Sequence, residues 1–172
     1  MLGGVWMVKT LTKQLADVLN RENEIYKTIY EISNNKTDLI VGGKVNEIEN
    51  ITKIEQSLII KISKLEDERE KIICKLCDLF GEKSNELTIS TLIGKIEKDD
   101  ADELKVCQDK IVGTINNLKK TNDLNEKLIK NSLEYIDFSI NMMTSIDTVN
   151  NSYGSSGFSG ETKKRNFFDM KL

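Results

Sequence analysis

The chain has 172 residues, with no histidine or proline, three cysteines and a net charge of −3. Histidine is the commonest general base near neutral pH and three thiols cannot complete a four-thiolate site, so we expect neither catalysis nor a metal or other cofactor. A net negative chain has no electrostatic reason to bind nucleic acid, and its longest near-apolar run, residues 57–62, is far shorter than the ~20 residues that span a bilayer.

Residues 1–6 are apolar but lack the positive region and the cleavage site of a signal peptide. Gly3 and Gly4 can be encoded by a ribosome-binding sequence, and Met7 follows at a suitable distance to be the start. We therefore hypothesise that translation begins at Met7, with Met1 left open as the alternative.

Apolar residues alternate at spacings of four and three over residues 11–39, which predicts a first helix over about 8–41 with a coiled-coil-like seam. Gly42 and Gly43 supply the left-handed geometry that ends helices. The alternation resumes over residues 48–79 and predicts a second helix over about 45–80. Because the connection is so short, the two helices are expected to lie antiparallel, as a hairpin of about 50 Å.

Three charged residues, Glu22, Glu55 and Arg69, occupy positions in these stripes where apolar residues are expected. They could form an internal ion pair that fixes the helix register, or lie at the edge of the bundle with their charges in water. Catalytic carboxylates are the least favoured interpretation, because nothing else in the chain would act with them.

The three cysteines comprise a CxxC pair, Cys74 and Cys77, and one distant thiol, Cys107. On a helix the pair would share a face, as two metal ligands would. A fourth ligand is lacking, however, and cysteine is often buried as a small apolar residue. We therefore predict packing in the core and no metal site.

The helical period is lost after Gly81, and residues 88–96 are expected to form a short connector helix capped by Thr88 or Ser90. A third helix is predicted over about 100–148, with Asn122 and Asn125 interrupting its apolar seam. At ~1.5 Å per residue it would be about 70 Å long, against about 50 Å for each of the first two helices. Its excess length is therefore expected to overhang the hairpin.

The predicted fold is all-α: an antiparallel three-helix bundle or coiled-coil hairpin over residues 1–149, with a long overhanging third helix, followed by a flexible C-terminal tail over residues 150–172. An apolar stripe without intramolecular cover marks an interaction site, although a bent helix or a dimer would also explain it. We favour an interaction site whose adjacent methionines suit more than one partner. Its candidate residues are Leu133, Ile136, Ile140, Met143 and Ile146.

The order of these elements resembles the FlgN family, together with LEDER at residues 65–69, NDLNEKL at 122–128, YGSSG at 153–157 and FFDMK at 167–171. The resemblance covers most of residues 11–172. It implies a cytoplasmic, non-enzymatic chaperone of flagellar type III export that holds hook-associated (hook-filament junction) proteins before their secretion.

The resemblance also implies roles for individual segments. The third helix and the region after it would bind the cargo, and Tyr153, Gly154 and Gly157 would dock on the flagellar export gate. The alternative that the helices alone support is a coiled-coil adaptor or signalling module that dimerises through its third helix. The sequence leaves the oligomeric state and the identity of the cargo open.

Overall fold

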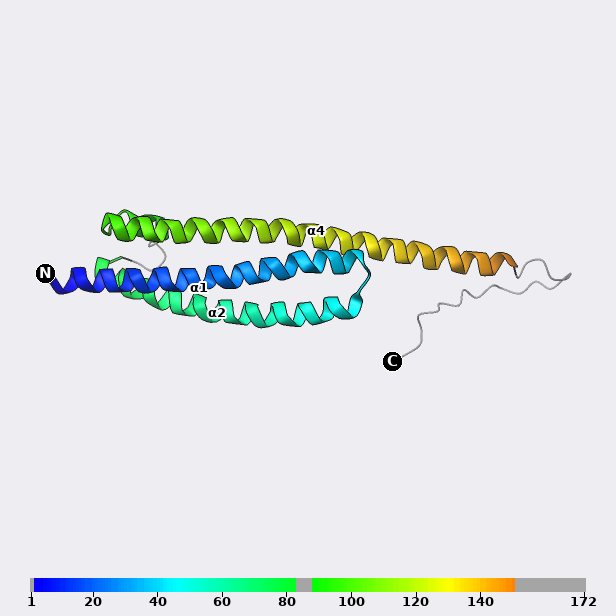
Figure 1. Ribbon diagram of the computed structural model, residues 1–172, viewed down its shortest axis with the longest axis horizontal. Helices are drawn as coiled ribbons and strands as arrows, with labels where there is room; N and C mark the ends of the chain where they lie inside the picture. Colours follow the sequence, from blue (N-terminus) through cyan, green and yellow to red (C-terminus); the bar gives the residue numbers. More distant parts are fainter. Residues whose placement is uncertain (1, 83–87, 151–172) are drawn as a thin grey trace. The chain divides into compact units, whose positions relative to one another are not determined.

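The computed structural model describes residues 2–82 and 88–150, with side chains for 4–82 and 88–144. Within these ranges it contains four helices and no strand: α1 (Leu2–Val41), α2 (Val45–Phe80), α3 (Ile89–Ile93) and α4 (Lys98–Asn150) (Figure 1). The predicted all-α fold is confirmed, although α1 begins earlier than expected. Among the residues described, none of the helices has the length and hydropathy needed to cross a membrane.

The chain divides into two compact units, residues 1–132 and residues 133–172. Unit 1 contains α1, α2, α3 and most of α4. Unit 2 begins inside α4, so this one helix contributes residues to both units. The predicted division, a bundle over residues 1–149 and a tail over 150–172, stays a prediction.

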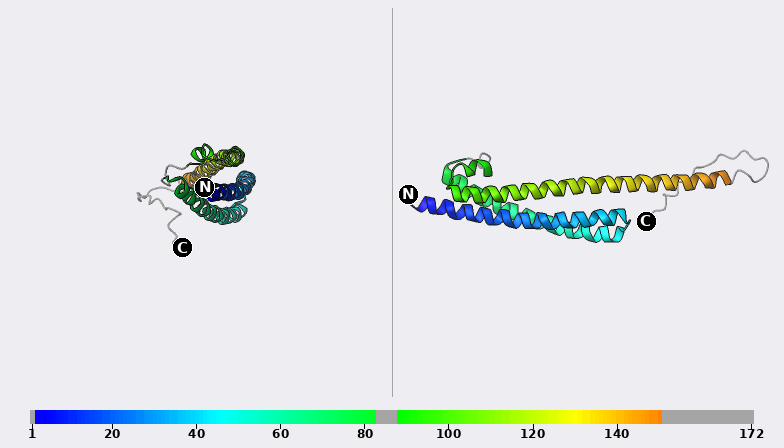
Figure 2. Two further views of the ribbon diagram at one scale, coloured as in Figure 1. Left: turned by 90° about the vertical axis from the view of Figure 1, so that its left-hand side faces the viewer. Right: turned by 45° about the horizontal axis from the view of Figure 1, so that its top comes forward.

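The turn between α1 and α2 depends on Gly43, whose φ of 65° is in the left-handed region that favours glycine. The Lys44 amide donates to the Leu39 carbonyl at 2.9 Å, and the Gly43 amide donates to the Ile40 carbonyl at 3.1 Å. These two hydrogen bonds form a Schellman motif, which satisfies the last carbonyls of α1 and reverses the chain. Helices α1 and α2 consequently lie side by side and antiparallel (Figures 1 and 2).

One apolar cluster joins all four helices of unit 1. Among its most deeply buried members are Leu15 of α1, Leu76 of α2, Leu92 of α3 and Leu104 of α4, each at most 1% exposed. Burying a leucine side chain contributes roughly 1.5–3 kcal/mol, so this cluster is the main source of stability in unit 1. Cys77 and Cys107 belong to it, which is the packing role expected for them.

The short helix α3 is fixed at both its start and its inner face. Thr88 caps it: the Thr91 amide donates to Thr88 Oγ1 at 3.2 Å, and the Thr88 amide donates to Thr91 Oγ1 at 2.8 Å. This reciprocal pair satisfies two amides at the helix start. Thr88, rather than Ser90, is therefore the cap, and Leu92 anchors the helix in the cluster.

Helix α4 of unit 1 runs parallel to α1. Hydrogen bonds join Cys107 to Asn20, Thr114 to Asn23 and Thr121 to Asn34, and the partners are separated by 87, 91 and 87 residues. A nearly constant separation along two helices is the signature of a parallel pair. Since α1 and α2 are antiparallel, α4 is antiparallel to α2, which is the predicted arrangement.

The two asparagines that interrupt the seam of α4 bind α1. Ser33 Oγ donates to Asn122 Oδ1 at 2.5 Å, Thr37 Oγ1 donates to Asn125 Oδ1 at 2.6 Å, and Asn125 Nδ2 donates to the Ser33 carbonyl at 2.9 Å. Ser33 is 0% and Asn125 4% exposed. We call this group the amide seam. Because a buried amide costs free energy without its partners, the amide seam favours one register of α4 on α1.

The charged residues in the apolar stripes form ion pairs between α1 and α2. Arg69 Nη1 lies 2.8 Å from Glu22 Oε2, and Lys36 pairs with Glu55. Glu22 is 1% exposed, and its other carboxylate oxygen is the one buried side-chain oxygen or nitrogen without a hydrogen bond among the described residues. Burial raises the pKa of the Glu22 carboxyl, and Arg69 opposes that rise.

The two buried thiols lie in surroundings that disfavour the charged thiolate. Burial is the main reason why the pKa of the Cys107 thiol is raised, and the same cause raises the pKa of Cys77. Within the part of the chain that the structure describes, no group of three or more metal-ligating side chains comes together. Cys77 and Cys107 therefore serve as packed side chains of the apolar cluster.

Candidate interaction surface

The part of α4 that belongs to unit 2 displays apolar side chains to solvent. Every large apolar side chain of residues 133–143 is exposed, from 38% for Ile140 to 71% for Tyr135. The backbone remains α-helical through Asn150. Exposed apolar residues scattered singly are ordinary, but here they are continuous along a helix, which is typical of a surface that a partner covers.

Four of the predicted residues share one face of this helix. Leu133, Ile136, Ile140 and Met143 follow each other at spacings of three, four and three, and they are 57%, 51%, 38% and 70% exposed. At 3.6 residues per turn such spacing keeps the side chains in one row. We call these four residues the aliphatic stripe.

The remaining predicted residues cannot be placed on this face. Ile146 continues the spacing and lies in α4, but its side chain lies outside the described residues. Tyr153, Gly154 and Gly157 also lie outside the described residues. Their expected roles therefore stay predictions.

A second apolar row runs along the same helix and was not among the predicted site residues. Tyr135, Phe138 and Met142 are 71%, 62% and 54% exposed, and their spacings are three and four. At about 100° per residue, this aromatic stripe lies on nearly the opposite side of the helix from the aliphatic stripe. The sequence contains the signal for it, because apolar residues of the aromatic stripe alternate along the chain with those of the aliphatic stripe. A helix that is apolar on two sides can be covered by two partner helices at once.

The charged residues within the span of the two stripes, residues 133–143, are both acidic. Glu134 and Asp137 are exposed, and residues 131–150 contain no lysine or arginine. The hydroxyl groups of this segment donate their hydrogen bonds within the helix. Ser139 Oγ donates to the Tyr135 carbonyl at 2.8 Å, and Thr144 Oγ1 donates to the Ile140 carbonyl at 3.0 Å. The surface therefore suits an amphipathic helix with basic residues beside its apolar face.

Comparison with known proteins places the chain in a family. The family model described as FlgN protein matches residues 7–159. The chain is also 28% identical over 162 residues to the uncharacterized protein YvyG of Bacillus subtilis (strain 168), an alignment that covers 92% of this chain and 98% of YvyG. No solved structure matches significantly. Because the family model covers most of the chain, the protein belongs to the FlgN family, a family of flagellar export chaperones.

Proposed function

We propose that this protein binds hook-associated (hook-filament junction) flagellar proteins in the cytoplasm through the C-terminal part of α4 and delivers them to the flagellar type III export gate. Membership of the FlgN family supports a role in flagellar export. The single observation that supports α4 as the binding element is the exposed aliphatic stripe, in a helix that buries Leu104, Cys107 and Ile111 nearer its start.

The physical basis is the covering of apolar surface that two proteins would otherwise expose. A secreted subunit kept from assembling presents amphipathic helices, and an apolar row on α4 can pack against one of them. Burying the four half-exposed side chains of the aliphatic stripe would contribute roughly 1 kcal/mol each, whereas association costs about 4–15 kcal/mol. The aliphatic stripe alone would therefore bind weakly, and a stable complex requires the cargo to cover the aromatic stripe as well.

The test is complex formation with purified hook-associated proteins, measured by size-exclusion chromatography and calorimetry. Substitution of both Ile140→Asp and Met143→Asp should weaken the complex by about 10–100-fold, because two carboxylates would be desolvated in the interface. Thermal unfolding of unit 1 should be unchanged.

The matched control is the pair Ile59→Asp and Ile60→Asp, which changes two exposed apolar residues of α2 that are 58% and 59% exposed. This control should bind normally. Equal affinity of the wild type and the Ile140/Met143 double variant would remove the aliphatic stripe from the binding surface. If the wild-type protein binds no hook-associated protein but dimerises through Ile140 and Met143, the protein is a coiled-coil adaptor or signalling module and not a chaperone.

For delivery we propose Tyr153, Gly154 and Gly157 as the residues that dock on the export gate. The support is the resemblance of YGSSG to the family's tail. A Tyr153→Ala variant should still form the cargo complex but should release less hook-associated protein into the culture medium. Undiminished secretion would show that docking does not depend on Tyr153.

A further inference from the structure

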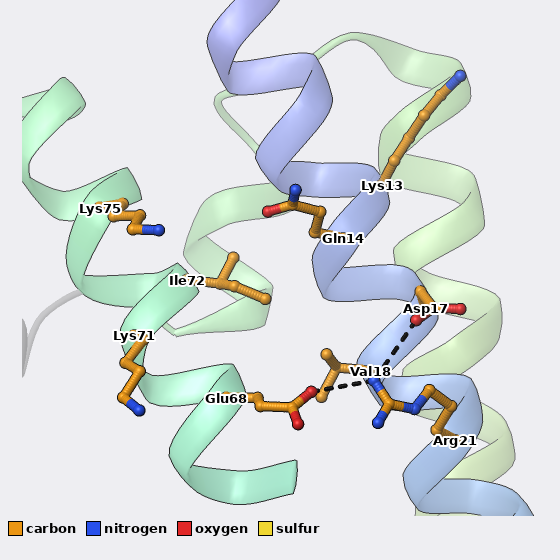
Figure 3. A pocket seen from close by; sticks show the side chains of 9 residues that line it. All are labelled: Lys13, Gln14, Asp17, Val18, Arg21, Glu68, Lys71, Ile72 and Lys75. Carbon is orange, nitrogen blue, oxygen red and sulfur yellow. Dashed lines mark hydrogen bonds and ion pairs between the residues drawn. The ribbon is translucent and has the colours of Figure 1, made fainter.

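A groove runs between α1 and α2 of unit 1. Two open cavities, of about 510 and 550 Å³, are lined by residues of both helices, and both cavities include Arg21 and Glu68. These two residues form an ion pair of 2.9 Å between the helices. The two cavities therefore adjoin at this ion pair, and we call them together the α1–α2 groove. Figure 3 shows the first of them, with Arg21 and Glu68 at one end.

The floor of the α1–α2 groove is apolar but already well packed. Val18, Leu65 and Ile72 are 4%, 4% and 8% exposed. Figure 3 shows Val18 and Ile72 between the two helices, with Lys71 and Lys75 extending from α2 and Arg21 from α1. Because so little apolar surface remains uncovered on this floor, apolar burial contributes little to any binding here and the charges of the rim dominate.

The rim of the groove is basic although the whole chain is acidic. Six basic and three acidic side chains line the two cavities, in a chain whose net charge is −3. Four of the basic ones form an exposed row on α2: Lys61, Lys64, Lys71 and Lys75. At 1.5 Å per residue this lysine row extends over about 21 Å, which is close to four helical turns.

We propose that the α1–α2 groove docks an acidic amphipathic helix of a partner protein, at a site separate from the aliphatic stripe. A helix lying between two antiparallel helices would complete a four-helix arrangement. Its narrow apolar side would face Val18 and Ile72, which are nearly covered already and add little, so its carboxylates would carry the binding. Its carboxylates, spaced three and four residues apart, would face the lysine row, whose own spacing is helical.

The acidic residues of the rim favour a helix over an anionic membrane. Asp17, Glu24 and Glu68 lie among the basic side chains and would repel a uniformly negative surface. A helix can place carboxylates opposite the lysines and neutral residues opposite these acids. Since every lysine of the row is exposed, the complex forms quickly, dissociates quickly and weakens with salt.

The test uses a synthetic peptide of about 20 residues, which as a helix would be about 30 Å long and so would cover the whole lysine row, with leucines on one face and glutamates beside them. Fluorescence anisotropy with the full-length protein should show binding of this peptide and none of its Glu→Lys counterpart. Affinity should fall about tenfold between about 50 and 300 mM salt. The double variant Lys64→Glu/Lys71→Glu should lose a further tenfold or more.

The matched control is Lys119→Glu/Lys120→Glu, which makes the same charge change at exposed residues of α4 in unit 1. It should retain the wild-type affinity for the peptide. Equal loss in both double variants would show general charge attraction and overturn the proposal, as would failure of the acidic peptide to bind. Binding to phosphatidylglycerol vesicles without binding to the peptide would also overturn it. Because Lys64 and Lys71 lie outside unit 2, their double variant should still bind hook-associated proteins.

Discussion

Two stretches of α4 carry apolar residues at closely similar spacings and have opposite environments. In unit 1, Leu104, Cys107 and Ile111 are 0%, 4% and 8% exposed. In unit 2, Leu133, Ile136 and Ile140 are 57%, 51% and 38% exposed. Apolar periodicity therefore identifies the face of a helix that must be covered, but not whether the cover comes from the same chain. The first stretch stabilises the protein, and the second is available to a partner.

The largest expected effect is a change in the free energy of unfolding, and it is tested by substituting one leucine from each stretch. Leu104→Ala should lower the free energy of unfolding by about 2–5 kcal/mol, because it leaves a cavity in the cluster that joins the four helices. Leu133→Ala should change it by less than about 0.5 kcal/mol, as expected of an exposed position. Urea unfolding followed by circular dichroism measures both. Similar losses would mean that Leu133 is covered within the protein.

A smaller effect is expected at the amide seam, where α4 is held by hydrogen bonds. Asn125→Ala removes one hydrogen-bond partner from Thr37 Oγ1 and one from the Ser33 carbonyl, which keep their 3.3 Å bond to each other, and this should cost about 1–3 kcal/mol in urea unfolding. The control is Asn131→Ala, at an exposed position six residues further along α4. An equal, negligible effect of both substitutions would show that the amide seam does not hold α4 on α1.

The smallest effect is a dependence of stability on pH, and it again separates the two units. Since burial raises the pKa of Glu22 above its ordinary value of 4.5, the unfolded chain releases this proton at a lower pH than the folded chain. The contribution of Glu22 to stability is thus fully present below pH 4.5 and is lost as the pH rises through the folded value.

Unfolding free energies measured across this range should therefore decline less steeply in Glu22→Gln than in the wild type. Glu134→Gln, at an exposed position of unit 2, should leave the curve unchanged. Identical curves for the wild type and Glu22→Gln would show that burial of Glu22 has no energetic consequence.

Local signals in the sequence were sufficient to predict most of unit 1. The hairpin turn followed from Gly42 and Gly43, because few other residues adopt the positive φ that the Schellman motif requires. Thr88 was one of two predicted caps, and the choice between them was decided by the reciprocal bonds with Thr91. Such features depend on residues close together in the chain, so a single sequence contains them.

Pairings between helices were harder to predict. Asn125 appeared as an interruption of an apolar seam, but its partners Ser33 and Thr37 lie about ninety residues earlier, and no spacing rule connects them. The charged residues Glu22 and Arg69 were recognised as out of place, while the choice between an ion pair and an exposed edge required the structure. The aromatic stripe was not predicted, because the four-three spacing that defines a helix seam selects one row of side chains and Tyr135, Phe138 and Met142 lie off that row.

The continuity of α4 has a consequence for how fast and how tightly unit 2 can bind. A peptide of about a dozen residues is largely unfolded in water, because starting a helix fixes several residues for a single hydrogen bond. Residues 133–144 avoid that step, since they extend a helix that begins at Lys98 and packs through Leu104, Cys107 and Ile111 in the core of unit 1. Unit 1 acts as a nucleus from which the binding segment propagates. A partner then meets side chains already arranged in rows, and less conformational entropy is lost when the complex forms.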